Sequence, residues 1–327
     1  MAKSSTVFSV WAALAGNLLV ALAKFVAAAV SGSAAITSEA VHSLIDTVNE
    51  VLLLYGISRS ARPADRTHPF GYGRELYFWS FVVALLIFAL GAGVSFYEGF
   101  NHVVVAQPIE RPGVIFAVLA VSLVFEGVSW WISVRAFRAA KGGLGWWEAF
   151  RRSKDPPAFI VIFEDSAALL GIAVAAAGTT AALLTGDARW DGAASLIISA
   201  ILAGVAALLA KESKELLIGE RADPALSEAI LRTASGIAGV CSANSIVTIQ
   251  IAPHSVVATL SLDFFDTLRA PDIERAVIEL ENRIRSLYPD VTALFVKPQS
   301  VLVASERRRE APGIADPSGE ADPLADG

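Results

Sequence analysis

Polar and ionisable side chains interrupt an otherwise apolar segment, EAVHSLIDTVNEVLLLYGI, at residues 39–57. Helical spacings of three and four residues place them along one face, and they are Glu39, His42, Asp46, Asn49 and Glu50. An ionisable group at the centre of a membrane helix costs about 2.5–3.5 kcal/mol to insert, so such groups usually face a cavity and carry a function. Asp46 lies at the middle of the segment, with His42 one turn before it and Glu50 one turn after it. This face is a candidate ladder of cation ligands, in which Glu39, Asn49 and Glu50 would serve as secondary ligands or as a relay.

A second apolar segment, FIVIFEDSAALLG, contains two adjacent carboxylates, Glu164 and Asp165. In hydrocarbon two neighbouring carboxylates repel each other and lose their water, so they need either protons or a cation. A divalent ion held by His42, Asp46, Asp165 and Glu164 would neutralise all of them. An imidazole nitrogen with carboxylate oxygens suits tetrahedral zinc, and the number of carboxylates also suits manganese or iron.

Other polar residues in the apolar segments have more than one interpretation. His42 and Asp46 could simply hydrogen-bond to each other across one helical turn. Glu126, within SLVFEGVSWW, could act as a relay for protons or ions. Alternatively, it could form a hydrogen bond that joins two helices. Lys24 has Glu39 as a candidate partner. Three residues are expected to join helices to one another: Asn17, Lys24 and Asn49.

The composition is that of a polytopic membrane protein with a soluble portion. Of 327 residues, 54% are apolar and 18% are charged. A membrane helix needs roughly 20 apolar residues. The sequence offers six such stretches, at residues 7–30, 34–57, 77–98, 113–136, 157–180 and 190–210.

The short loops between these stretches divide sharply by charge. Thirteen lysines and arginines fall on one side, namely Lys3, Arg59, Arg62, Arg66, Arg74, Arg135, Arg138, Lys141, Arg151, Arg152, Lys154, Lys211 and Lys214. Only Arg111 and Arg189 fall on the other side. Cytosolic loops are the positively charged ones, so both termini are expected in the cytosol. No targeting segment is recognisable, which favours a bacterial inner membrane.

A soluble pattern begins after the last apolar stretch. Residues 216–300 read in the order α-β-β-α-β, which predicts a small α+β domain with its helices on one face of the sheet. Residues 1–215 would form the transmembrane domain, and the polar tail 301–327 is expected to be disordered. The single cysteine, Cys241, excludes an internal disulfide and is expected to be buried.

Three segments together resemble the cation diffusion facilitators, a family of zinc transporters. They are SGSAAITSEAVHSLIDTVNEVLLLYGI, DRTHPFGYGR and EDSAALLGI, and the resemblance extends over residues 10 to 300. It implies a homodimer that exports a divalent metal from the cytosol in exchange for protons, with a metallochaperone-like αββαβ domain that helps the protomers dimerise. Zinc is expected first, with manganese, iron or cobalt as alternatives. Membrane lipid surrounds the helices, and no nucleic-acid partner is expected.

The resemblance also assigns residues to the transport site. The family's (H/D)xxxD motif in the second span falls on His42 and Asp46, and the Asp of the fifth-span HxxxD motif falls on Asp165. The histidine of that motif is replaced by Val161, and the sequence is similar to the branch of the family that carries ED in place of this histidine. Glu164 looks like the substitute fourth ligand. It is rotated by about 100° from Asp165 around the helix, so the coordination geometry is not expected to be the usual one.

Some family members bind a second ion in the loop after the second span. Asp65 and His68 match two of its ligands, but Tyr72 stands in place of a further histidine. A weak or absent second site is therefore expected.

Two functions of other classes compete with transport. A metal-dependent intramembrane hydrolase would need a motif such as HExxH, which the sequence lacks. A subunit that binds or senses metal without transporting it would keep the same ligands. Metal flux in proteoliposomes separates such a subunit from a carrier.

Overall fold

The computed structural model describes residues 2–304, and of residues 2–13, 15 and 16 it describes the backbone alone. The chain divides into two compact units. The first holds the chain up to Pro63 together with Glu75–Lys214, and the second holds Ala64–Arg74 with the described residues from Glu215 onward. The loop Ala64–Arg74 thus belongs with the C-terminal part of the chain. The predicted division at residue 215 had placed this loop in the transmembrane domain.

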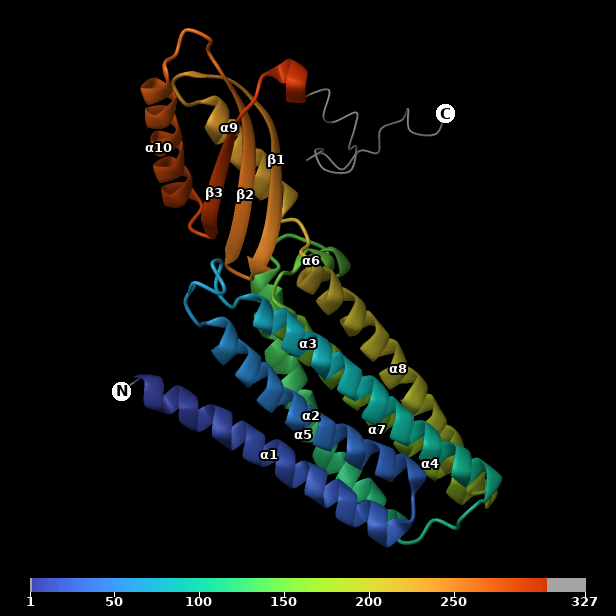
Figure 1. Cartoon of the computed structure of the whole chain (residues 1–327). Coiled ribbons are helices and arrows are strands. Elements are labelled where there is room, and N and C mark those ends of the chain that lie inside the picture. The colour runs from blue at the N-terminus through green and yellow to red at the C-terminus, as the bar shows by residue number, and fades with distance from the viewer. Residues whose placement is uncertain (1, 305–327) are drawn as a thin grey trace, which may run out of the picture. The chain divides into compact units, whose positions relative to one another are not determined.

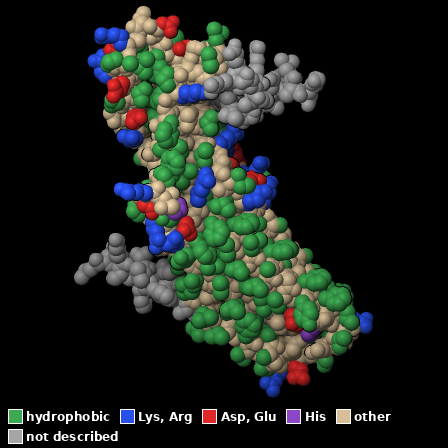
Figure 2. Space-filling model, in the orientation of Figure 1, with side chains coloured by type: hydrophobic (Ala, Val, Ile, Leu, Met, Phe, Trp, Pro, Cys, Tyr) green, Lys and Arg blue, Asp and Glu red, His purple; other side chains and the backbone are tan. Residues whose placement is uncertain are grey.

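Long helices that lie side by side make up the first unit (Figure 1). The helices are α1 (Ala2–Ser31), α2 (Ala34–Ser60), α3 (Arg74–Leu86) continued by η1 (Ile87–Ala92) and α4 (Gly93–Val104), α5 (Pro112–Ala140), α7 (Pro156–Thr185) and α8 (Arg189–Ile218). Five of these spans, from α2 onward, are long and apolar enough to cross a membrane, and the described part of α1 adds a shorter apolar segment, Asn17–Ser31. The visible face of these helices is covered with hydrophobic side chains (Figure 2). The predicted class of helical membrane protein is confirmed.

Two features of this unit were not predicted from the sequence. The third span contains a π-helical segment, η1, between α3 and α4. Ser199 on α8 donates a hydrogen bond of 2.8 Å to the carbonyl oxygen of Ala92, the last residue of this segment. Ser195 donates one of 2.7 Å to the carbonyl oxygen of Ser95, three residues further on. The second feature is a short helix, α6 (Trp146–Arg152), between α5 and α7.

A tight turn joins α1 to α2. Gly32 has a positive φ of 65°, a conformation that favours glycine. Ser33 caps α2, because its hydroxyl accepts a hydrogen bond of 3.2 Å from the Ile36 amide. Asp191 of α8 is fully buried beside this cap, where it accepts hydrogen bonds from the Ser33 hydroxyl (2.7 Å) and the Ala35 amide (3.2 Å). The start of α2 is therefore held in place by α8, the helix of this unit that is most distant from it in the sequence.

The second unit has the predicted αββαβ order. Its elements are α9 (Pro224–Ser235), β1 (Val240–Ala252), β2 (Ser255–Phe264), α10 (Ala270–Leu287) and β3 (Val291–Pro298). The sheet has the order β1-β2-β3, with β1 antiparallel and β3 parallel to β2. Ile230 of α9 and Leu280 of α10 pack with Leu260 of β2 in one apolar core, so both helices cover the same face. The predicted fold of this unit is confirmed.

The C-terminal part differs from the prediction at Cys241 and at the start of the tail. Cys241 is exposed, not buried as predicted, because it lies at the start of β1 on the side away from the core. Residues 301–304 form a helical turn, although the predicted disordered tail began at 301. The rest of that predicted tail lies outside the described residues.

Candidate functional site

The polar face of α2 is turned into the helix bundle, as its spacing predicted. Glu39, His42 and Asn49 are each at most 1% exposed, whereas Asp46 and Glu50 are partly buried. Neighbouring α2 positions such as Leu44 and Val48 are exposed and belong to the apolar outer surface. A row of polar side chains, one on each successive turn of α2, thus runs through the interior of the unit.

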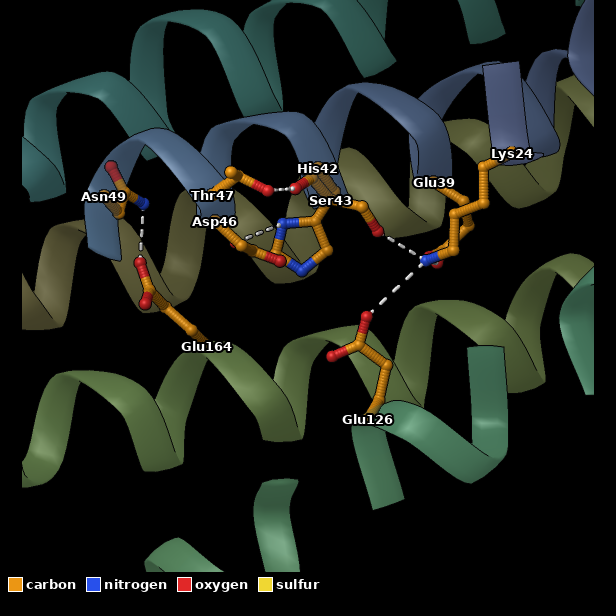
Figure 3. A network of polar contacts seen from close by, with 9 residues as sticks. All are labelled: Lys24, Glu39, His42, Ser43, Asp46, Thr47, Asn49, Glu126 and Glu164. Atoms are coloured by element: carbon orange, nitrogen blue, oxygen red, sulfur yellow. Dashed lines mark hydrogen bonds and ion pairs between the residues drawn. The ribbon is translucent and has the colours of Figure 1, made fainter. Parts of the chain in front are cut away.

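His42 and Asp46 lie next to each other in the middle of this row (Figure 3). The His42 Nδ1 atom is 3.3 Å from Asp46 Oδ1, without the geometry of a hydrogen bond. Both ring nitrogens of His42 and Asp46 Oδ1 are buried and have no hydrogen-bond partner among the described residues. Buried polar atoms are nearly always paired, so these atoms are suited to take an ion or a water molecule as a partner. Three potential ligand atoms are therefore available here.

The two carboxylates of α7 turn toward different helices. Glu164 accepts a hydrogen bond of 2.6 Å from the Asn49 amide on α2, and Asp165 accepts one of 2.9 Å from the Ser129 hydroxyl on α5. Adjacent helical residues are separated by about 100°, which explains the divergence. Val161, at the position of the family's histidine, lines an apolar hollow between α5 and α7 together with residues such as Ala136. Glu164 is thus the α7 carboxylate that faces α2.

The predicted ligands are not gathered into one coordination shell in this conformation. Among the residues that the structure describes, no three His, Cys, Asp or Glu side chains lie close enough together to hold a metal ion. His42 and Asp46 form a pair, but Glu164 and Asp165 are each held by a neutral side chain. Metal binding by all four would need Glu164 and Asp165 to leave Asn49 and Ser129.

A second ionic cluster lies one turn along α2 from His42, and its centre is Lys24 of α1 (Figure 3). The Lys24 Nζ atom donates hydrogen bonds to Glu39 Oε2 (3.1 Å) and Ser43 Oγ (2.6 Å), and it lies 3.8 Å from Glu126 Oε1 on α5. The contact between Lys24 and Glu39 was a candidate from the sequence, and it is present. The contact with Glu126 was not foreseen, since nothing in the sequence relates α1 to α5.

Two further polar contacts complete the interior. Asn17 on α1 donates a hydrogen bond of 3.1 Å to Glu50 Oε2 on α2, so Asn17 and Asn49 join helices as predicted. Gly171 on α7 provides the space for the Glu39 carboxylate, because a Cβ atom at this position would overlap Glu39 Oε1. This close approach was not predicted from the sequence.

The loop after α2 holds Asp65 in a turn of its own. Asp65 Oδ1 accepts hydrogen bonds from the Thr67 and His68 amides, and Oδ2 accepts one of 2.7 Å from the Tyr72 hydroxyl. The Tyr72 hydroxyl, followed by these amides, lowers the pKa of the Asp65 carboxyl. Both carboxylate oxygens are therefore engaged within the loop. The expectation of a weak or absent second metal site here stays a prediction.

Comparison with known proteins identifies the class of this chain. Residues 10–218 match the family model described as the cation efflux transmembrane domain, which spans the six apolar segments and the site described above. The chain belongs to the cation efflux family, the cation diffusion facilitators. It is therefore an integral membrane protein of a transporter class, not an enzyme, and the hydrolase hypothesis is set aside.

Curated relatives agree with this assignment. The chain is 38% identical over 203 residues to a Xenopus laevis protein named proton-coupled zinc antiporter SLC30A9, mitochondrial; the match covers 62% of this chain and 36% of the relative. It is 34% identical over 217 residues to metal tolerance protein C4 of Arabidopsis thaliana, covering 66% of this chain and 48% of the relative. An uncharacterized transporter of Methanocaldococcus jannaschii, MJ0449, is 21% identical over 274 residues, or 84% of this chain and 91% of the relative.

These matches cover less than half of the length of the first two relatives. The word mitochondrial in the first name gives no support to the expected bacterial inner membrane.

Proposed function

We propose that this chain exports a divalent metal cation, zinc first, in exchange for protons. The observation that carries the proposal is the pair His42 and Asp46, whose buried ligand atoms have no hydrogen-bond partner among the described residues. Glu164 on α7 faces the same helix. The relative named as a proton-coupled zinc antiporter supports zinc and proton coupling.

His42, Asp46, Glu164 and Asp165 are the proposed ligands. An imidazole nitrogen and three carboxylates satisfy the preferences of zinc, and the oxygen-rich set also accommodates manganese, iron or cobalt. Glu164 reaches the ion by releasing Asn49, and Asp165 by releasing Ser129. Both steps exchange a neutral hydrogen bond for a bond to a divalent charge, which is the stronger interaction in a medium of low dielectric constant.

Proton coupling follows from the chemistry of these ligands. A metal ion binds deprotonated carboxylates and neutral imidazole, so metal binding expels protons and proton binding expels the metal. The affinity for metal must therefore rise with pH. A site near the middle of the bilayer that opens alternately to each side converts this competition into antiport.

Assembly as a homodimer through the second unit is part of the same proposal. Its exposed large apolar side chains include Val247 and Ile249 on β1 and Phe295 on β3. Such residues on a small domain are candidates for contact with a second copy. The mass of the detergent-solubilised chain, with and without residues 216–327, tests this point.

Transport is tested by metal flux into proteoliposomes that contain a fluorescent zinc indicator, with and without a pH gradient. Asp46→Ala or Asp165→Ala should abolish flux while the protein still folds and dimerises. Asp187→Asn is the matched control, because Asp187 is exposed in the turn between α7 and α8. Full flux in either alanine variant would contradict the site assignment. Binding of zinc without flux in the unaltered protein would favour the alternative of a non-transporting sensor.

A further inference from the structure

Lys24 is a fully buried lysine that bridges three helices. Its ammonium group contacts Glu39 and Ser43 of α2 and Glu126 of α5 (Figure 3). Lys24 and Glu39 are 0% exposed, and the Glu126 side chain is 16% exposed. A buried charge is tolerated only when it is paired, and Glu39 and Glu126 supply the negative charges that pair with Lys24.

The groups around the ammonium form a set of oxygen ligands. Glu39 Oε2, Ser43 Oγ and Glu126 Oε1 all point to one position, which the Lys24 Nζ atom occupies. Two carboxylates and a hydroxyl are ligands that divalent cations accept. Glu39 Oε1 is also buried, lies against Gly171 of α7, and has no hydrogen-bond partner among the described residues. Glu39 therefore has a second carboxylate oxygen, besides the one that contacts Lys24, that a cation could bind.

The cluster lies on the same face of α2 as the proposed transport site. Glu39 precedes His42 by three residues and Asp46 by seven, which corresponds to about 10 Å between Glu39 and Asp46 along the helix. The cluster around Lys24 lies closer to the turn between α1 and α2 than the pair His42 and Asp46 does. A cation that moves along this face from Asp46 toward the turn meets Glu39 and Glu126 after His42.

We infer that Glu39, Glu126 and Ser43 form a second cation station on the transport path, which the ammonium group of Lys24 occupies when no metal is present. The inference rests on the proposed transport function. Lys24 neutralises the two carboxylates while the station holds no metal, and its positive charge opposes a metal ion that stops there. The lysine thus keeps the station from becoming a trap for the metal.

The number of metal ions bound at equilibrium tests this inference. Purified protein in detergent is titrated with Zn²⁺ alone, and bound metal is counted per protomer. We expect one ion for the unaltered chain and two for Lys24→Met, because the carboxylates then lack their counter-cation. Lys24→Arg, which retains the charge, should bind one ion, and Lys24→Met with Glu39→Gln should return to one. A folded Lys24→Met variant that binds only one ion would overturn the inference.

A second comparison separates this inference from the transport site itself. Asp46→Asn should remove the first ion, and Lys24→Met combined with Asp46→Asn should bind one ion at the station. If Asp46→Asn leaves zinc binding unchanged, the proposed transport site fails. If the combined variant binds no ion while Asp46→Asn alone removes one, only the station fails.

A transport measurement covers the case in which Lys24→Met does not fold. Glu39→Gln keeps the shape of the side chain and leaves Lys24 charged beside the path. We expect zinc flux to fall at least tenfold while zinc affinity at His42 and Asp46 changes less than threefold. Flux at the rate of the unaltered protein would place the cluster outside the path and contradict the inference.

Discussion

Asn49 on α2 donates a hydrogen bond of 2.6 Å to Glu164 on α7, and this bond holds one proposed metal ligand away from the others. Both residues are buried. If Glu164 is a metal ligand, as we propose, the amide would compete directly with the metal for Glu164. Metal binding would then replace the hydrogen bond between α2 and α7 by a metal-mediated link between the same two helices.

Replacing Asn49 by alanine tests this competition. Glu164 would lose its partner in the metal-free state, which costs about 1–3 kcal/mol for a buried acceptor. The metal-bound state would not suffer this loss, so zinc affinity should increase by roughly tenfold or more. Calorimetric titration with zinc measures the affinity, and thermal unfolding without metal should show a lower midpoint. Unchanged affinity would mean that Glu164 keeps its bond to Asn49 when zinc binds.

Glu164→Gln tests whether Glu164 is a ligand. Glutamine keeps an oxygen that can accept from Asn49, so the metal-free fold should be preserved. Zinc affinity should nevertheless fall at least tenfold, because a neutral amide is a much weaker ligand than a carboxylate. The same titration and a thermal unfolding control separate binding from stability. Unaltered affinity would assign Glu164 a purely structural role.

Asp191→Ala tests the anchor at the start of α2. Asp191 is 0% exposed and accepts hydrogen bonds from Ser33 and Ala35, so its removal leaves buried donors unpaired. We expect a loss of about 1–3 kcal/mol of stability. Thermal unfolding in detergent measures it. Asp187→Asn is the control and should change the midpoint much less, because Asp187 is exposed in the nearby turn and asparagine keeps an oxygen that accepts from the Arg189 amide.

Gly171→Ala tests the slot that holds Glu39. The added methyl group would overlap Glu39 Oε1, so the carboxylate must move and weaken its contact with Lys24. A lower unfolding midpoint is expected. Gly204→Ala on α8 is the matched control, since a Cβ atom there meets nothing within 4 Å. That control should be neutral or stabilising by up to about 1 kcal/mol, because alanine favours the helix.

Tyr72→Phe tests the electrostatics of the loop after α2. The Tyr72 hydroxyl stabilises the ionised form of Asp65, so its removal should raise the pKa of Asp65 toward the ordinary aspartate value. A depressed pKa contributes stability above the ordinary pKa and loses it as the pH falls through the lower value. The loop should therefore respond to pH only in acid, and not near neutrality. A pH titration of the Asp65 side-chain carboxyl resonance in both proteins measures the difference.

Local patterns in the sequence were sufficient to predict the classes of structure. Apolar length predicted the membrane helices, and helical spacing together with β-branched runs predicted the αββαβ unit, since these signals depend on neighbours along the chain. Spacing alone also placed Glu39, His42, Asp46 and Asn49 on one face of α2. The buried position of that face agrees with the cost of exposing charge to lipid.

Tertiary packing decided the partner of each polar group. No spacing rule relates Lys24 to Glu126, or Asp191 to the cap at Ser33, because these contacts join helices that are far apart in the sequence. The rotation of α7 about its own axis, which turns Glu164 to α2 and Asp165 to α5, is likewise fixed by packing against two neighbours. Helical periodicity determines which residues share a face, but the surrounding helices determine what that face meets.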